Sequence, residues 1–168
     1  MEEETAVRFE YTYRNTPRDF WLFYMGNIYR NWTGIINVIF TAAFLVLLVR
    51  RWADAPLWGR GILVFAVLAF PVLQPLAVWG RSVRESERIT EDTTLLFDKA
   101  GMHIAVKEHR QTIPWNSFFD RGLVKLKGIL AVIPDGMHAY LLPDRVTGAE
   151  REKLTDFITK MCGKEHRG

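Results

Sequence analysis

The sequence predicts an α+β membrane protein: a hairpin of two transmembrane helices joined to an antiparallel β-sheet or partial barrel that a C-terminal helix closes. Two apolar runs, residues 33–49 and 61–79, contain no charged residue. At about 1.5 Å per residue these runs form helices of roughly 25 and 28 Å, close to the hydrocarbon thickness of a bilayer. Short segments with turn signals follow them, and an amphipathic segment ends the chain.

The chain of 168 residues divides into three parts. Residues 1–31 hold a strand and an amphipathic helix, residues 32–80 the hairpin, and residues 81–168 a small domain with room for a modest core. The apolar run begins too late for a cleavable signal peptide, so we expect an uncleaved anchor. A single cysteine, Cys162, excludes an intramolecular disulfide, and we interpret it as a half-buried structural thiol.

The charge balance argues against nucleic acid as a partner. Residues 90–168 carry twelve Lys and Arg against eleven acidic residues, whereas residues 32–89 carry six Arg against three. The excess therefore lies around the hairpin, where arginines set topology, and does not mark a face that binds nucleic-acid phosphates.

Residues 7–13 alternate between apolar and polar side chains, as a strand does. A single strand is unstable, so we predict that it pairs with the C-terminal sheet. Thr16 then suits a helix N-cap, with Pro17 and Asp19 in the first turn, and the helix should run to about Tyr29. Its aromatic stripe fits two locations equally well: the membrane interface, or a face of the C-terminal domain.

Tryptophan and arginine flank both apolar runs. Four tryptophans at the ends of the runs, and one in the preceding helix, are candidate contacts with the membrane interface or a partner: Trp32, Trp52, Trp58, Trp79 and Trp21. Six arginines lie near the outer ends of the hairpin and three in its connecting loop, which predicts that both termini are cytoplasmic.

Two polar side chains interrupt the apolar runs at matching depths. Asn37 lies four residues from the start of the first run, and Gln74 five from the end of the second. We expect them to bond each other, or backbone carbonyls freed by Pro71 and Pro75. The alternative is a polar contact with a partner's helix. Neither run contains an ionisable residue, so a transporter or channel formed by this chain alone is not expected.

The C-terminal part reads as a succession of short strands. We predict strands at 93–97, 102–106, 110–115, 118–125, 129–133 and 137–142, and a helix at 148–161 capped by Thr147. Pro114 should end its strand at an edge or bulge. Trp115 is either an exposed anchor for a partner or a core residue, and its neighbours Pro114 and Phe118 favour the core.

Four motifs carry a resemblance to a known family: T-P-R-D at 16–19, F-D-K-A-G-M at 97–102, I-P-W-N-S-F at 113–118 and L-L-P-D-R at 141–145. With the order of strand, helix, two spans and domain, they resemble the YcxB-like family of bacterial membrane proteins across nearly the whole chain. The resemblance implies a pleckstrin-homology-like C-terminal domain and a location in the bacterial inner membrane. It implies no reaction.

No residue set predicts an enzyme, a cofactor or a metal site. The four histidines, His103, His109, His138 and His166, have no metal-ligand spacing, and the serines lack a nucleophile-elbow context. We therefore expect a non-enzymatic, membrane-anchored interaction protein, an accessory or scaffold subunit of an inner-membrane complex that contacts the lipid bilayer and a membrane-protein partner or further copies of itself. The alternative is a membrane-tethered module that senses a lipid or peptide.

Overall fold

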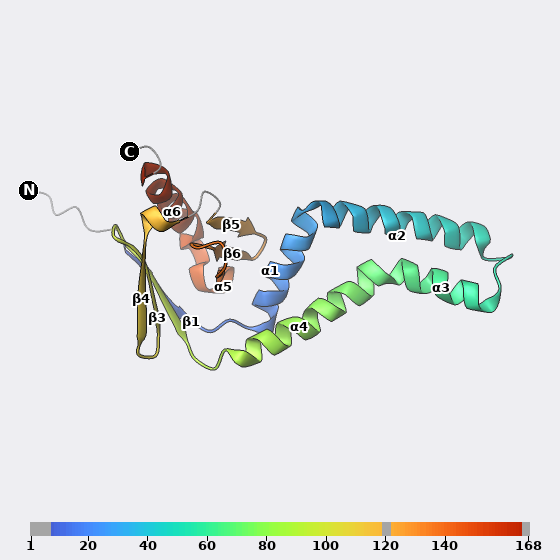
Figure 1. Cartoon of the computed structure of the whole chain (residues 1–168), viewed down its shortest axis with the longest axis horizontal. Coiled ribbons are helices and arrows are strands. Elements are labelled where there is room, and N and C mark those ends of the chain that lie inside the picture. Colours follow the sequence, from blue (N-terminus) through green and yellow to red (C-terminus); the bar gives the residue numbers. More distant parts are fainter. Residues whose placement is uncertain (1–7, 119–121, 166–168) are drawn as a thin grey trace, which may run out of the picture.

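The computed structural model describes residues 8–118 and 122–165. Val7 of the predicted first strand and His166 lie outside the described residues. A long helical hairpin extends from one side of a β domain, and a short helix lies at their junction (Figure 1). The chain is thus α+β, as the sequence predicts.

The first sheet has four antiparallel strands in the order β1-β2-β3-β4. Their bounds are Phe9–Tyr13, Thr93–Phe97, Gly101–Val106 and His109–Pro114. In β1, Phe9 lies opposite Phe97 and Tyr13 opposite Thr93. The predicted pairing of the N-terminal strand is confirmed, so the whole hairpin is inserted between two neighbouring strands.

The second sheet contains β5 (Leu123–Leu126), β6 (Ile129–Val132) and β7 (Tyr140–Pro143) in that order. The two sheets are separate and do not close into a barrel. Pro114 ends β4, and the 3₁₀ turn η2 (Trp115–Ser117) follows it. A proline donates no backbone hydrogen bond, so the chain leaves the first sheet at this point.

Two predicted strand boundaries are wrong. Of the strand expected at 118–125, residues 119–121 lie outside the described residues. Phe118 packs in the core directly after the turn η2, and the described strand β5 begins at Leu123. The strand expected from Met137 begins at Tyr140. The Asp135 carboxylate accepts the backbone N–H groups of Met137 and His138 at 2.9 and 2.7 Å, which holds those residues in a turn.

The main core lies between the two sheets and the C-terminal helix. The inward side chains of β1, Phe9, Tyr11 and Tyr13, alternate with exposed Glu10 and Thr12. Trp115 is buried at 3% exposure and stacks near Phe97, so its predicted core position is confirmed. The side chains of Leu154 and Ile158 on the C-terminal helix complete this core.

The C-terminal helix starts later than predicted. After β7 come α5 (Asp144–Thr147), the 3₁₀ turn η3 (Gly148–Glu150) and α6 (Arg151–Glu165). Gly148 has a φ of +52°, which lies outside the helical range and delays the helix to Arg151. Thr147 is buried and forms no hydrogen bond through its hydroxyl with a described residue, so it does not cap α6.

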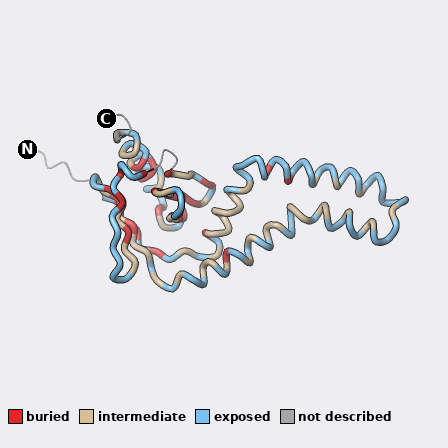
Figure 2. Tube along the Cα trace, viewed as in Figure 1, coloured by how far each residue is buried: buried red, intermediate tan, exposed pale blue. Residues whose placement is uncertain are grey.

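The helices before the domain are α1 (Pro17–Arg30), α2 (Trp32–Arg51), α3 (Leu57–Leu68), the π-helical turn η1 (Ala69–Leu73) and α4 (Gln74–Arg88). Two segments, Trp32–Arg51 and Leu57–Arg88, are long and apolar enough to cross a membrane. Both exceed the predicted 33–49 and 61–79, because flanking Trp and Arg residues continue the helices. Their side chains are mostly exposed or half-buried, whereas the buried residues are concentrated in the β domain (Figure 2).

Helix α1 packs against the hairpin and the second sheet together. It crosses from α4 to the start of α2 (Figure 1). Its Phe20, Leu22 and Phe23 cover the face of the second sheet that bears Ile129 and Leu141. All four residues of β6 are buried, because the main core covers one face of the sheet and α1 the other. Packing of α1 on the domain is confirmed; its contact with a membrane interface stays a prediction.

Candidate functional site

The end of the hairpin nearer the β domain contains the polar pair that the sequence indicated. The Asn37 amide is 4% exposed, and its Nδ2 donates to Gln74 Oε1 at 2.8 Å. The predicted hydrogen bond is confirmed. One turn further along α2, the Thr41 hydroxyl donates to the Asn37 carbonyl at 2.8 Å. Polar groups are therefore concentrated at one level of an otherwise apolar hairpin.

The π-helical turn η1 lies directly beside this pair. Pro71 lies within η1 and Pro75 just after it, and neither donates a backbone hydrogen bond. The helix accommodates them by one wider turn, as π-bulges commonly do. Gln74 follows this turn and points its side chain toward Asn37. The Trp21 indole of α1 donates to the Pro75 carbonyl at 3.2 Å, which ties α1 to this region.

A shallow groove of about 320 Å³ opens beside the polar pair. Its lining includes Phe70 and Pro71 of η1, the polar α2 residues Asn37 and Thr41, and Tyr29 of α1. The groove has the shape and chemistry to accept an apolar chain or the side chains of another helix.

The tryptophans at the hairpin ends are exposed and separate from one another. Their exposed fractions are 79% for Trp32, 48% for Trp52, 72% for Trp58 and 45% for Trp79. At the tip, the Arg60 guanidinium lies 5.3 Å from the Trp52 ring and donates to the Ala55 carbonyl at 3.0 Å. The structure thus joins Asn37 with Gln74, but leaves these four rings as independent surface groups.

An ion pair between buried Asp19 and half-exposed Arg145 fixes α1 to the β domain, and no sequence pattern indicated it. The Asp19 carboxylate accepts the Thr16 backbone N–H at 2.8 Å and the Arg145 guanidinium at 2.7 Å. Arg145 also donates to the Arg14 carbonyl at 2.8 Å. Burial, and then the charge of Asp19, raise the pKa of Tyr13 beside this pair. The T-P-R-D and L-L-P-D-R motifs meet here; their separation by more than a hundred residues gave no signal of contact.

The other two motifs meet at one corner of the first sheet. The Trp115 indole donates to the Asp98 carbonyl at 2.9 Å. Gly101 has a φ of +155°, and a Cβ there would lie 2.4 Å from the Ile113 carbonyl oxygen. F-D-K-A-G-M and I-P-W-N-S-F therefore form a structural corner that requires both the glycine and the tryptophan.

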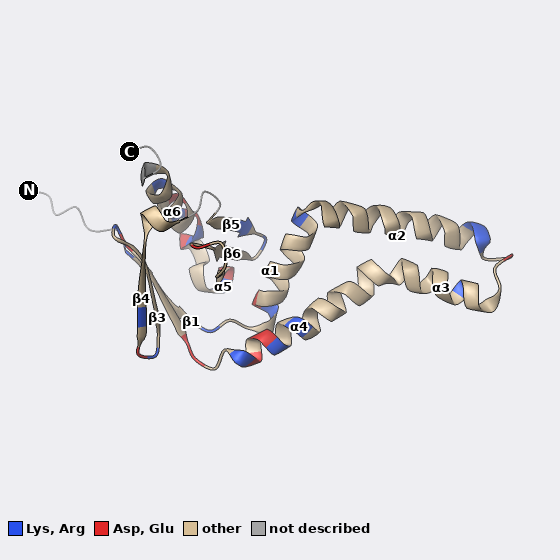
Figure 3. Cartoon of the chain, in the orientation of Figure 1, with Lys and Arg blue, Asp and Glu red and all other residues tan. Residues whose placement is uncertain are grey.

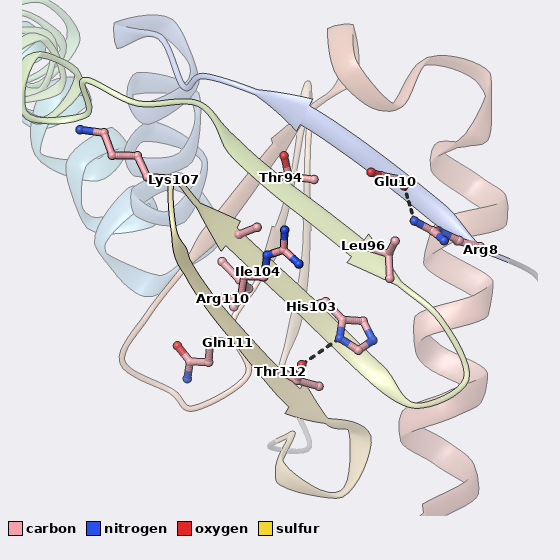
Figure 4. Close-up of a pocket in the computed structure, with 11 residues that line it drawn as sticks. Arg8, Glu10, Thr94, Leu96, His103, Ile104, Lys107, Arg110, Gln111 and Thr112 are labelled. Carbon is pink, nitrogen blue, oxygen red and sulfur yellow. Dashed lines mark hydrogen bonds and ion pairs between the residues drawn. The ribbon is translucent and has the colours of Figure 1, made fainter.

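The outer face of the first sheet carries a small polar network (Figure 4). The His103 ring bonds Thr112 Oγ1 through Nδ1 and Asp98 Oδ2 through Nε2, both at 2.9 Å. Burial alone would raise the pKa of Asp98, but hydrogen bonds from His103 and the backbone outweigh it and lower the pKa. Both ring nitrogens are already bonded, so the imidazole acts here as a link between β3, β4 and the preceding turn.

The described residues contain no group of three or more His, Cys, Asp and Glu side chains arranged to hold a metal ion. Cys162 is half-buried, and burial raises the pKa of its thiol, in keeping with the structural interpretation of this residue. Comparisons with protein-family models, with curated proteins and with solved structures gave no match.

Proposed function

We propose that the chain is a non-enzymatic, membrane-anchored interaction protein, an accessory or scaffold subunit of a bacterial inner-membrane complex. The observation that carries this proposal is the hairpin itself: its large apolar side chains point outward along α2, α3 and α4, and its polar pair lies beside an open groove. An apolar hairpin attached rigidly to a folded domain is suited to lateral association with other membrane helices.

The hairpin spans the membrane twice in this proposal, and both termini are cytoplasmic. The lengths and composition of Trp32–Arg51 and Leu57–Arg88 support the spanning segments. The excess of arginines at the domain end supports the orientation. A reporter enzyme fused after Gly168 tests the orientation: activity restricted to the cytoplasm is expected, and periplasmic activity would refute it.

We also propose membership of the YcxB-like family and a pleckstrin-homology-like domain. Two packed antiparallel sheets followed by a C-terminal helix support the domain assignment. Contacts between the four motifs support the family proposal. Two motifs meet at the Asp19–Arg145 ion pair, and the other two meet where Trp115 bonds the Asp98 carbonyl.

The experiment that tests the scaffold function is native-size analysis with mass spectrometry after gentle detergent extraction from the source membrane. A large complex of defined stoichiometry is expected, and its other subunits would name the process. A chain that runs alone, in a membrane whose complexes are unchanged by its deletion, would overturn the scaffold function and favour the lipid- or peptide-sensing alternative.

The polar pair provides a sharper variant for the same experiment. Asn37→Leu with Gln74→Leu removes one interhelical hydrogen bond, worth about 0.6 kcal/mol on average in membranes. We expect the double variant to stay folded in detergent and to keep its complex. Loss of the complex with unchanged unfolding would instead assign the pair to direct contact with a partner helix.

A further inference from the structure

Helix α4 continues well beyond the apolar part of the hairpin. The continuous helical segment Leu57–Arg88 has 32 residues, about 48 Å at the helical rise and thus longer than a hydrocarbon core of about 30 Å. Trp79 is the last aromatic residue of the predicted span, and residues 80–88 extend about 13 Å past it. This extension carries three arginines (Figure 3).

The three arginines share one face with exposed apolar residues that precede them. At about 100° per residue, an arc of about 80° around the helix includes two apolar residues, Leu73 and Ala77, and all three arginines, Arg81, Arg84 and Arg88. All five residues are exposed. Ser82, on another side of the same helix, is completely buried against the protein. One exposed face of α4 therefore changes from apolar to basic along its length.

The arginines are largely free of carboxylate partners. Arg84 forms no ion pair with a described residue, and Arg88 lies 3.8 Å from Glu85 with its own side chain 76% exposed. Arg81 stacks over the Tyr24 ring of α1 at 4.6 Å, which holds its guanidinium close to the helix. Glu87 is also exposed on α4. It lies about 60° around the helix from Arg84 and about 100° or more from Arg81 and Arg88, and it forms no ion pair with any of the three.

We propose that this face, Leu73 to Arg88, binds an anionic phospholipid of the cytoplasmic leaflet. The acyl chains lie along Leu73 and Ala77, and the headgroup phosphate lies among Arg84, Arg88 and the exposed edge of Arg81. The order of apolar then basic groups matches the order of chains then phosphate in a phospholipid. Guanidinium groups suit phosphate, because their planar N–H groups donate in pairs.

This inference rests on the proposed membrane insertion and deepens it. Any bilayer accommodates an apolar hairpin, but a basic face of this kind favours anionic lipid. Each arginine near an anionic surface contributes a gain of about fivefold in binding. Loss of two arginines should therefore weaken phosphatidylglycerol binding by about 30-fold. Salt should weaken the wild-type binding, because exposed charges are screened.

The test is native mass spectrometry of the full chain in detergent, titrated with phosphatidylglycerol or with phosphatidylcholine. The variant is Arg84→Gln with Arg88→Gln. The matched control is Lys153→Gln with Lys160→Gln, which removes two exposed charges from α6. In parallel, each protein is reconstituted in phosphatidylcholine vesicles and extracted with alkaline carbonate, which reports insertion independently of lipid charge.

The expected result is tight phosphatidylglycerol binding by the wild type and the control, weak phosphatidylcholine binding, and the stated loss in the arginine variant. Equal binding of both lipids by a wild type that resists carbonate extraction would overturn this inference and leave membrane insertion standing. An equal loss in the lysine control would overturn it too. Complete release of the wild type by carbonate would refute the proposed insertion, and this inference with it.

Discussion

At the scale of single residues, Asp19 is the only charged residue that is buried among the described residues. Its side chain is 3% exposed, whereas that of its partner Arg145 is 47% exposed. The carboxylate also accepts both the backbone N–H and the hydroxyl of Thr16. The carboxylate thereby satisfies hydrogen-bond donors at the start of α1 and, through Arg145, connects this end of the helix to the β domain.

Loss of the guanidinium should be costly, because it leaves the buried carboxylate with donors from Thr16 alone. We expect Arg145→Met to lower the free energy of unfolding in detergent by about 2 kcal/mol. Asp19→Asn should be less damaging, since Arg145 can rehydrate. The matched control is Arg8→Met, which breaks an exposed pair with Glu10 and should cost less than about 0.5 kcal/mol. Equal effects of Arg145→Met and Arg8→Met would contradict the anchoring role.

Asp98 gives a prediction of pH dependence. Its pKa in the folded state is lowered, because hydrogen bonds from His103 and from the N–H groups of Ala100 and Gly101 outweigh the effect of burial. A lowered pKa stabilises the fold above the unfolded-state value of about 3.9, and this contribution disappears as the pH falls through the folded-state pKa.

The variant Asp98→Asn removes this titration. Chemical denaturation should show the largest difference between wild type and variant near neutral pH, and a shrinking difference below about pH 4. A difference that stays constant from neutral to acidic pH would show that the carboxylate charge contributes nothing.

At the scale of elements, the corner between α1 and α2 decides how the hairpin leaves the domain. Asn31 adopts an extended conformation between the two helices. Gly34 is buried in the first turn of α2, and a Cβ at this position would lie 2.7 Å from the Tyr29 Cα. The corner can therefore be this tight only with glycine at position 34.

We predict opposite effects for two helical glycines. Gly34→Ala should destabilise the protein by about 2 kcal/mol, because the new methyl group meets backbone atoms. Gly80→Ala adds its methyl group in open space, and should stabilise α4 by up to about 1 kcal/mol through helix propensity. Thermal unfolding in detergent measures both; a tolerated Gly34→Ala would refute the tight corner.

At the scale of the whole molecule, both ends of the hairpin are secured by the same sheet. Strands β1 and β2 pair directly, although 79 residues separate Tyr13 from Thr93, and the Arg14–Asp92 ion pair at 3.0 Å follows them toward the hairpin. Helix α1 braces the hairpin against the second sheet. The hairpin is therefore oriented by the domain, which is consistent with the proposed scaffold function.

A cross-strand disulfide tests this closure. Thr12 and Thr94 are directly opposite on the outer face, with their hydroxyl oxygens 2.8 Å apart. In a Cys162→Ala background, Thr12→Cys with Thr94→Cys should form an intramolecular disulfide under mild oxidation. Thr12→Cys with Thr112→Cys, at opposite edges of the sheet, should not. Failure of the first pair would contradict the four-stranded sheet.

Elements that depend on local sequence patterns could be predicted without the structure. The length of the two uncharged apolar runs predicted the two hairpin helices. Alternation of apolar and polar residues predicted β1, and Thr16 with Pro17 predicted the start of α1. The similar distances of Asn37 and Gln74 from the same end of the hairpin also predicted their hydrogen bond. In two antiparallel helices, residues at equal distances from one end lie at the same level. Predicted boundaries were wrong where side chains bent the backbone, as Asp135 does before β7.

Tertiary structure alone decided what depends on contacts between distant segments. The Asp19–Arg145 pair and the stacking of Arg81 on Tyr24 arise when α1 is packed between the hairpin and the domain. No local periodicity encodes such contacts, because each partner taken separately has the sequence pattern of an ordinary exposed or capping residue. The position of α1 follows from the burial of two apolar faces at once, which requires the folded domain and the hairpin together.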